Sequence, residues 1–429
     1  MNMEAPQVNP KSLWAATANT PELFPSLRGD IRARVVVIGG GFTGLSCALH
    51  LSEMSRDTVV LESRRPGWGA SGRNGGQVIP GLKFDPDELE EMYGADLGSR
   101  VVQTVGSAAD YLFSTINRLA IHCDANRSGW IQPAHAPGAL ATITRRAKQW
   151  IERGAPAKIL DRDEVSAMVG SQAYIGGWLD LRGGSIQPLS YVQGLASAAA
   201  RRGARIFSQT STTSIRKVDG GWSVQTPSGS VTADKLVLAT NAYSDRLWPK
   251  LARTIVPTFS LQVATEPLPH DIGKSILPGG HAASDTLRLL RYFRRDRDGR
   301  FILGARGPFK EDVSQLDAGE QIRAMKKLFP QLEGIKLEYV WSGQVAMTAD
   351  HLPHINDLGA GAFAALGFNG RGVALTTTIG RLLAQLVAEG RPDEIDFPVS
   401  SMKPLPFHGY NRIAVRFLTQ YYRLRDSIE

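Results

Sequence analysis

The feature that most constrains this chain is a glycine-rich turn at residues 39–44, which read GGGFTG and fit the spacing GxGxxG. A short β-branched run at residues 34–38 precedes it and is typical of a buried parallel strand. Apolar residues at helical spacing follow to about residue 55, and residues 58–62 form a second strand-like run. Together these segments predict a βαβ unit of about 30 residues.

Each part of this unit has a physical role if the ligand is a dinucleotide. Gly39 permits the tight turn, Gly41 lets the backbone approach a pyrophosphate, and Gly44 lets the helix pack closely on the sheet. The helix N-terminus supplies N–H donors and a partial positive charge. Glu62, which follows Gly39 by 23 residues, is placed to accept hydrogen bonds from an adenosine ribose, in NAD or in FAD. The alternative is a glycine turn that only packs a helix.

A second glycine-rich segment, residues 67–77, follows the βαβ unit directly. Four polar residues stand among its glycines: Ser71, Arg73, Asn74 and Gln77. The backbone amides of such a loop can wrap a cofactor while its polar side chains reach phosphates or ring edges, which favours FAD; the alternative is a surface loop. A third glycine-rich turn, residues 367–372, opens a helix that runs to about residue 388.

The order of the predicted elements favours an α/β fold in which a Rossmann-like FAD-binding domain is interleaved with a strand-rich α+β substrate domain. Further helical patterns fall at residues 86–120, 138–153, 189–202 and 318–328. The predicted division is an N-terminal arm at 1–30, a discontinuous FAD-binding domain at 31–115, 175–257 and 341–392, a substrate domain at 116–174 and 258–340, and a C-terminal extension at 393–429.

On these motifs the sequence resembles the D-amino-acid oxidase/glycine oxidase (DAO) superfamily of FAD-dependent oxidoreductases, and within it the gamma-glutamylputrescine oxidases. The residues that carry the resemblance are 39–44, Glu62 and above all 69–77 (GASGRNGGQ), together with 13–19, 184–188, 239–243, 264–267, 341–343 and 422–426. The resemblance therefore covers nearly the whole chain.

The resemblance implies cofactor contacts in and around the three glycine-rich segments. The pyrophosphate and the adenosine would lie against Gly39, Gly41, Phe42, Thr43, Gly44, Glu62, Ser63 and Arg64. The flavin would be lined by Ala70, Ser71, Asn74, Gly75, Gly76 and Gln77. Thr213, in the strand after the 189–202 helix, corresponds to a backbone contact with adenine, and Asn241 and Ala242 follow a strand that runs under the cofactor. A second helix N-terminus would face the flavin pyrimidine, where it stabilises negative charge, at Gly370, Arg371, Gly372 and Val373.

The activity implied by the resemblance is oxidative deamination of an amine, gamma-glutamylputrescine or a similar ω-amine, by hydride transfer to flavin N5. The products would be an aldehyde, ammonia and, if oxygen is the acceptor, hydrogen peroxide. Tyr292 and Phe368 are the candidates for the substrate pocket. No catalytic residue is assigned, because hydride transfer in this superfamily needs no obligatory side-chain base. Ile302 stands where some sarcosine-oxidising relatives have a lysine, so oxidase and dehydrogenase both stay open.

Three other functions are compatible with the sequence. An FAD-dependent oxidase or dehydrogenase of a secondary or D-amino acid, such as sarcosine, glycine or proline, would need a carboxylate-binding arginine, for which the candidates are Arg291, Arg294 and Arg306. The second alternative, suggested by the net charge of +8, is a flavin-bearing RNA-binding protein. The third alternative is a non-catalytic FAD subunit. No nucleic-acid partner is expected, because the arginines at 288–300 fit an exposed hairpin around Asp298 and Gly299 and no RRM, KH or helix-turn-helix pattern accompanies them.

The two cysteines, Cys47 and Cys123, lie outside the 67–77 loop, which also has no histidine, so the FAD is expected to be non-covalent. Both cysteines are expected to be reduced and buried. Residues 1–30 have no apolar signal segment, and no apolar run approaches the roughly 18 residues of a spanning helix. These features predict a cytoplasmic protein with no membrane span.

Two further segments are given structural interpretations. His351 and His354 beside Asp350 are not expected to bind a metal, because a proline intervenes and no third ligand is clustered with them. The aromatic and basic stretch at 417–425 is expected to be a packed terminal helix, with a membrane-surface helix as the alternative.

Overall fold

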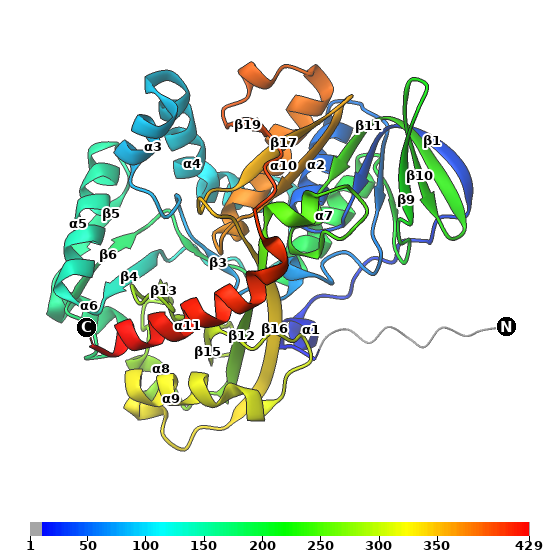
Figure 1. The fold of residues 1–429 in the computed structure, drawn as a ribbon. Helices are drawn as coiled ribbons and strands as arrows, with labels where there is room; N and C mark the ends of the chain where they lie inside the picture. Colours follow the sequence, from blue (N-terminus) through cyan, green and yellow to red (C-terminus); the bar gives the residue numbers. More distant parts are fainter. Residues whose placement is uncertain (1–10, 429) are drawn as a thin grey trace.

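The computed structural model of the protein describes residues 11–428, so residues 1–10 of the predicted N-terminal arm lie outside the described residues. Two large β-sheets with helices packed on them organise the chain (Figure 1). The predicted βαβ unit is confirmed as β1 (Gly29–Ile38), α2 (Phe42–Glu53) and β2 (Thr58–Leu61). The two strands are parallel, from Val35 opposite Thr58 to Ile38 opposite Leu61.

The nine-stranded sheet contains this unit near its centre. Its strand order is β19–β17–β18–β11–β1–β2–β8, and the hairpin β9–β10 pairs with β11 beside this path. The bounds are β8 (Arg205–Phe207), β9 (Ser214–Val218), β10 (Gly221–Thr226), β11 (Gly229–Leu238), β17 (His354–Gly359), β18 (Ala362–Leu366) and β19 (Val399–Ser401). Because β11, β1, β2 and β8 run parallel, their carboxyl ends meet at one edge, where ligands bind in open α/β sheets.

Helix α2 is buried between this sheet and the helices α7 (Pro188–Arg201) and α10 (Gly372–Glu389), and α10 also packs on α4 (Ala95–Leu119). A Cβ at Gly380 of α10 would lie 2.5 Å from Ser46 Cβ of α2, so the two helices approach closely only because glycine stands there. The helical stretch predicted at 86–120 is divided into α3 (Pro86–Tyr93) and α4. The break falls at Gly94, whose φ of +79° favours glycine.

The eight-stranded sheet has the order β16–β12–β15–β14–β13–β4–β6–β5. Its bounds are β4 (Trp130–Ala134), β5 (Ala157–Leu160), β6 (Gly176–Asp180), β12 (Val256–Pro267), β13 (Ala282–Ser284), β14 (Tyr292–Arg295), β15 (Arg300–Arg306) and β16 (Leu337–Met347). The accompanying helices are α5 (Pro137–Glu152), α6 (Arg162–Val169), α8 (His270–Ser275) and α9 (Gly319–Leu328). The fold is thus a Rossmann-like domain interleaved with a strand-rich one, as predicted.

The predicted arginine-rich hairpin is confirmed as the antiparallel pair β14–β15. Its turn includes Gly299, whose φ is +82°. Arg300 forms ion pairs with Asp296, Asp298 and Glu338, so acids of the same hairpin and of β16 neutralise much of its charge.

Sheet membership differs from the predicted division in three places. β6 and most of β16 fall in segments assigned to the FAD-binding domain, but they pair with β4 and β12 in the eight-stranded sheet. β19 falls in the C-terminal extension, but it pairs with β17 of the nine-stranded sheet. These pairings join segments far apart in the chain, and a local hydrophobic pattern carries no information about them.

The terminal helix α11 (Asn411–Ile428) lies across the outside of the eight-stranded part (Figure 1). The prediction that it is packed is wrong for one of its faces. Val415, Thr419 and Tyr422 are partly buried, whereas Phe417 and Tyr421 are 74% and 51% exposed. Both faces carry apolar or aromatic residues at helical spacing, so the sequence could not show which of them meets the protein.

Shorter elements complete the fold: α1 (Leu13–Thr17) and the two-stranded pair β3 (Gln77–Val78) and β7 (Gly184–Ser185). Within residues 11–428, none of the helices combines the length and the apolar character needed to cross a bilayer.

Candidate active site

The turn between β1 and α2 can be formed only by glycine at its key positions. Gly39 has a φ of +110°, and a Cβ there would lie 2.7 Å from the carbonyl oxygen of Ala239. A Cβ at Gly41 would lie 2.9 Å from Ser71 Oγ, and one at Gly44 would clash with the carbonyl of Gly39. Because these positions have no side chains, the backbone at the start of α2 is open to the close approach of a pyrophosphate.

Glu62 lies immediately after β2, at the carboxyl edge of the sheet. Its Oε2 accepts a hydrogen bond from the N–H of Gly40 (2.7 Å) and its Oε1 one from the N–H of Arg64 (2.8 Å). Burial raises the pKa of Glu62, and the two N–H donors oppose this shift. The carboxylate thus fixes the glycine turn and keeps acceptor capacity for a ribose hydroxyl.

The 67–77 loop closes over this turn through its side chains. Ser71 Oγ accepts from the N–H of Phe42 (2.9 Å). Asn74 donates to the carbonyl oxygens of Ala70 (3.1 Å) and Ser71 (2.9 Å) and accepts from the N–H of Gly76 (2.8 Å). The side chain of Asn74 was predicted to reach the cofactor, but it holds the loop in shape and leaves backbone atoms to face a ligand.

Gln77 is likewise committed to the protein. It donates to the carbonyl oxygens of Ala283 (2.9 Å) and Phe293 (3.1 Å) and accepts from Ser284 Oγ (2.7 Å). These bonds attach the glycine-rich loop to β13 and β14, so the loop has a fixed position relative to the eight-stranded sheet.

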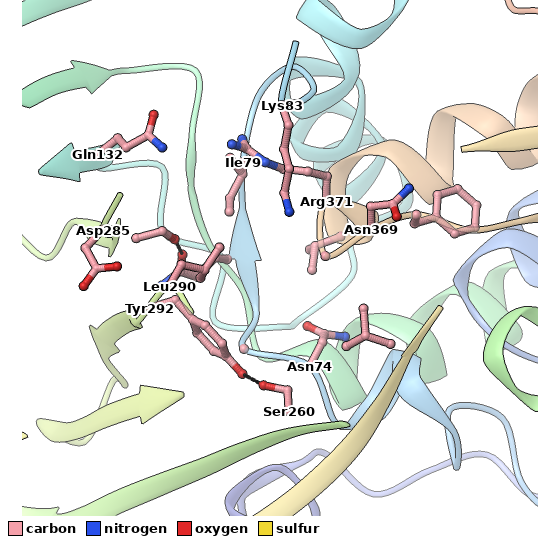
Figure 2. A pocket seen from close by; sticks show the side chains of 18 of the residues that line it. Asn74, Ile79, Lys83, Gln132, Ser260, Asp285, Leu290, Tyr292, Asn369 and Arg371 are labelled. Atoms are coloured by element: carbon pink, nitrogen blue, oxygen red, sulfur yellow. Dashed lines mark hydrogen bonds between the residues drawn. The ribbon is translucent and has the colours of Figure 1, made fainter. Parts of the chain in front are cut away.

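A cavity of about 1010 Å³ lies between this loop, the start of α10 and the eight-stranded sheet (Figure 2). The predicted cofactor residues that line it are Phe42, Ala70, Ser71, Asn74, Gly75, Gln77, Asn241, Gly370, Arg371, Gly372 and Val373. Both predicted substrate residues, Tyr292 and Phe368, line it as well. Residues separated by more than 300 positions in the chain are thus brought to one cavity.

The other predicted cofactor residues lie outside the cavity lining. Gly39, Gly41, Thr43, Gly44 and Glu62 form the glycine turn and its support, Ser63 and Arg64 are exposed beside it, and Ala242 is buried behind Asn241. Gly76 faces away, since a Cβ there would clash with the carbonyl of Ile186. Thr213 lies in the loop before β9 and not in the strand after α7, which is β8; its N–H donates to the carbonyl oxygen of Gln225 (2.8 Å).

Tyr292 of β14 and Gln262 of β12 line the cavity from the eight-stranded sheet. Tyr292 donates to or accepts from Ser260 Oγ at 2.6 Å, and burial raises the pKa of its phenol, so the hydroxyl is neutral. Gln262 donates to the carbonyl oxygen of Arg73 (2.5 Å). Its Oε1 is buried and has no hydrogen-bond partner among the described residues. Gln262 therefore lines the cavity, while this oxygen itself is enclosed by the protein.

Arg371 is the N-cap residue of α10, which confirms the predicted helix start. Its guanidinium stacks on Trp130, 5.0 Å from the ring centre, and donates to the carbonyl oxygen of Pro80 (3.3 Å). Burial lowers its pKa to about 9, and no carboxylate of the described residues lies within ion-pair distance. The cavity therefore holds a buried positive charge at the start of a helix, where anionic groups are stabilised.

The three arginines considered for carboxylate binding lie elsewhere. Arg294 donates to the carbonyl oxygens of Gly75 (2.8 Å) and Ile186 (2.7 Å) and stacks on Trp14. Arg306 borders a separate groove beside α11, and Arg291 is not part of the cavity lining. None of these three candidates for the amino-acid-oxidising alternative lines the cavity.

Several cavity residues were missed by the sequence analysis: Lys83, Gln132, Arg146, Ser260 and Gln262. They come from strands and a helix of the eight-stranded part and from the loop after β3, and none belongs to a motif. His354 pairs with Asp350 (2.9 Å), and residues 11–428 contain no group of three His, Cys, Asp or Glu side chains placed to bind a metal.

The fold and this site define a class: oxidoreductases in which a dinucleotide-binding sheet and a strand-rich sheet enclose one cavity for cofactor and substrate. Residues 34–386 match the family described as FAD dependent oxidoreductase (DAO), and the chain belongs to this family. It is therefore an FAD-dependent oxidoreductase.

Individual relatives agree with this membership. Gamma-glutamylputrescine oxidoreductase of Escherichia coli (strain K12) is 34% identical over 428 residues, which cover 97% of this chain and 98% of that protein. The crystal structure of glycine oxidase from Geobacillus kaustophilus superposes with a TM-score of 0.73 at 21% identity, covering 85% of this chain and 96% of that one. The structure of L-proline dehydrogenase from P. horikoshii gives a TM-score of 0.71 at 20% identity, covering 86% and 96%.

Proposed function

We propose that the protein catalyses the oxidative deamination of gamma-glutamylputrescine or a similar ω-amine. The observation that carries this proposal is the cavity, which is lined by the 67–77 loop, by the start of α10 and by Tyr292 of the strand-rich sheet. The similarity over nearly the full length to a gamma-glutamylputrescine oxidoreductase supports the choice of substrate.

The nine-stranded part would hold FAD without a covalent bond. Gly39, Gly41 and the first residues of α2 would bind the pyrophosphate, and Glu62 the adenosine ribose. Residues 70–77 and 370–373 would line the flavin, with the α10 N-terminus at the pyrimidine. Both cysteines are free and buried inside the protein, which supports non-covalent binding and a cytoplasmic location.

Bound FAD supplies the redox chemistry by accepting a hydride from the carbon next to the amine nitrogen. The protein's own residues position and desolvate the substrate. The Tyr292 and Phe368 rings, which line the cavity, would exclude water from the reacting carbon. Hydrolysis of the resulting imine would give an aldehyde and ammonia, and oxygen, giving hydrogen peroxide, or another acceptor would take up the two electrons.

A second candidate is oxidation of a secondary or D-amino acid such as sarcosine, glycine or proline. Arg371 favours it, because this buried cation lines the cavity without a carboxylate partner among the described residues and could hold an amino-acid carboxylate. The two candidates differ in where the carboxylate lies relative to the oxidised carbon.

The test is anaerobic mixing of the purified holoenzyme with gamma-glutamylputrescine, putrescine, sarcosine, glycine, proline or D-alanine. Loss of the flavin absorption band with gamma-glutamylputrescine, and little change with the amino acids, supports the proposal. Bleaching by an amino acid alone supports the second candidate. If no amine bleaches the flavin band but a partner protein reduces the flavin, the chain is a non-catalytic FAD subunit.

A further inference from the structure

The cavity extends well beyond the residues assigned to the cofactor. On the side of α5, which lies far from α2 and α10 in Figure 1, it is lined by Pro137, Gly138, Thr142, Ile143 and Arg146, and by Lys83 from the loop after β3. This region has no role in the binding of FAD described above.

Positive charge is concentrated in this region. Arg146 donates from Nη2 to the carbonyl oxygen of Lys83 (2.5 Å), so the two residues are adjacent. In Figure 2, the Lys83 side chain projects into the cavity from the same side as Arg371. Burial lowers the pKa of Lys83 to about 8, and repulsion from Arg371, Arg306 and Arg146 adds to the effect.

The nearby acids do not balance this charge. Asp85 is buried and accepts from both Arg145 and Arg146, at 2.7 Å in each case, so one carboxylate serves two guanidinium groups. No carboxylate of the described residues lies within ion-pair distance of Lys83. An unpaired, partly buried ammonium group is unfavourable unless a ligand neutralises it.

We propose that Lys83 and Arg146, the distal subsite, bind a carboxylate at the end of the substrate remote from the oxidised carbon. This inference rests on the proposed function, because it assumes an amine substrate whose reacting end lies at the flavin. Gamma-glutamylputrescine has this form, with the primary amine of its putrescine half at one end and the α-carboxylate of its glutamyl half, beside an α-ammonium group, at the other. The first turn of α5, whose N-cap residue Ala136 provides no side-chain cap, adds a partial positive charge on the same wall.

The test compares two amides of the same length. Gamma-glutamylputrescine has the terminal carboxylate, and 4-aminobutyryl-putrescine lacks only that group. In Lys83→Met, KM for gamma-glutamylputrescine should rise by about tenfold to a hundredfold, the range for one charge-assisted hydrogen bond, with little change in kcat. KM for the carboxylate-free amide, whose remote end is an ammonium group, should not rise, and Lys83→Arg should retain most of the affinity for gamma-glutamylputrescine.

The matched control is Lys148→Met, which removes an exposed lysine of α5 that does not line the cavity. An equal effect of Lys83→Met on both amides, or no effect on either, would overturn the distal subsite. A loss of FAD affinity in Lys83→Met would also overturn the distal subsite, because Lys83 would then bind the cofactor.

A second measurement separates this inference from the proposed function. Glutarate, titrated into the oxidised holoenzyme and followed by isothermal titration calorimetry, should bind Lys83→Met about tenfold or more weakly than the wild type. If the wild type does not oxidise gamma-glutamylputrescine, the proposed function fails while this titration still decides on the subsite. Equal glutarate affinity in both proteins, or no binding to the wild type, contradicts the distal subsite.

Discussion

The ring of Tyr292 lies directly against the backbone of Gly75: a Cβ added at Gly75 would come within 2.7 Å of Tyr292 Cε2. The same ring covers Gly304 of β15, where a Cβ would clash with it. One aromatic ring of the strand-rich sheet thus contacts both the glycine-rich loop and β15. Tyr292 and Gly75 also line the cavity, at the point where we place the reacting groups.

Gly75→Ala should displace Tyr292 and weaken its 2.6 Å hydrogen bond to Ser260. Overpacking of this kind costs about 1–3 kcal/mol, so we expect a lower kcat/KM for the amine and a lower free energy of unfolding. Steady-state kinetics and denaturant titration measure the two effects. Gly409→Ala is the control, since a Cβ there would meet nothing within 4 Å; equal behaviour of the two variants would refute the importance of the contact.

Glu62→Gln should weaken FAD binding by about tenfold to a hundredfold, because the charged acceptor of the Gly40 and Arg64 N–H groups is lost. Equilibrium titration of apoprotein with FAD, followed by flavin fluorescence, gives the dissociation constant. The exposed Glu152 of α5 supplies a control variant, Glu152→Gln. An unchanged dissociation constant in Glu62→Gln would place the adenosine elsewhere.

The lowered pKa of Lys83 makes a prediction about stability and pH. Its charged form is disfavoured in the folded state, so the penalty is fully present below about pH 8 and disappears as pH rises towards the ordinary lysine value of 10.5. Lys83→Met should therefore raise the melting temperature at pH 7 and have a smaller effect at pH 10. Arg371, Arg306, Arg146 and His351 are the charged or titratable neighbours. A melting temperature of Lys83→Met below that of the wild type at pH 7 would contradict this account.

Burial raises the pKa of the Cys47 thiol, and it raises the pKa of Cys123 to about 12. Because the thiolate is the reactive form, neither cysteine should react with a maleimide at neutral pH in the folded protein. Both should react after denaturation, which mass spectrometry counts directly. Rapid labelling of the native protein at either position would show that the packing around it is looser than described.

Asp426 of α11 accepts hydrogen bonds from the N–H groups of Arg288 (3.2 Å) and Leu289 (3.1 Å), in a loop that borders the cavity. Asp426→Ala should speed amide hydrogen exchange at these two positions by about fivefold, since one hydrogen bond contributes about 1 kcal/mol. The effect should be confined to the 286–290 loop. Unchanged exchange there would mean that α11 does not hold the loop.

The sequence predicted the parts of the site that are local in the chain. The glycine turn, the end of β2 and the start of α10 each depend on a few adjacent residues with a strict backbone requirement, as at Gly39. Gln262, Lys83 and Arg146 could not be predicted, because their position in the cavity depends on how β12, α5 and the loop after β3 meet. The hydrogen bonds that the side chains of Asn74 and Gln77 make could not be predicted either, because they too depend on the folded arrangement of the chain.

The most direct test of the central claim uses gamma-glutamylputrescine with deuterium on the carbon that bears the terminal amine of its putrescine half. The holoenzyme is mixed anaerobically with the deuterated or the unlabelled substrate, and loss of the flavin absorption band is followed by stopped flow. We expect full bleaching with both, slowed several-fold by deuterium, because the bond from that carbon to hydrogen breaks as the flavin is reduced. A flavin band that persists at saturating concentrations of either substrate would contradict the proposed function.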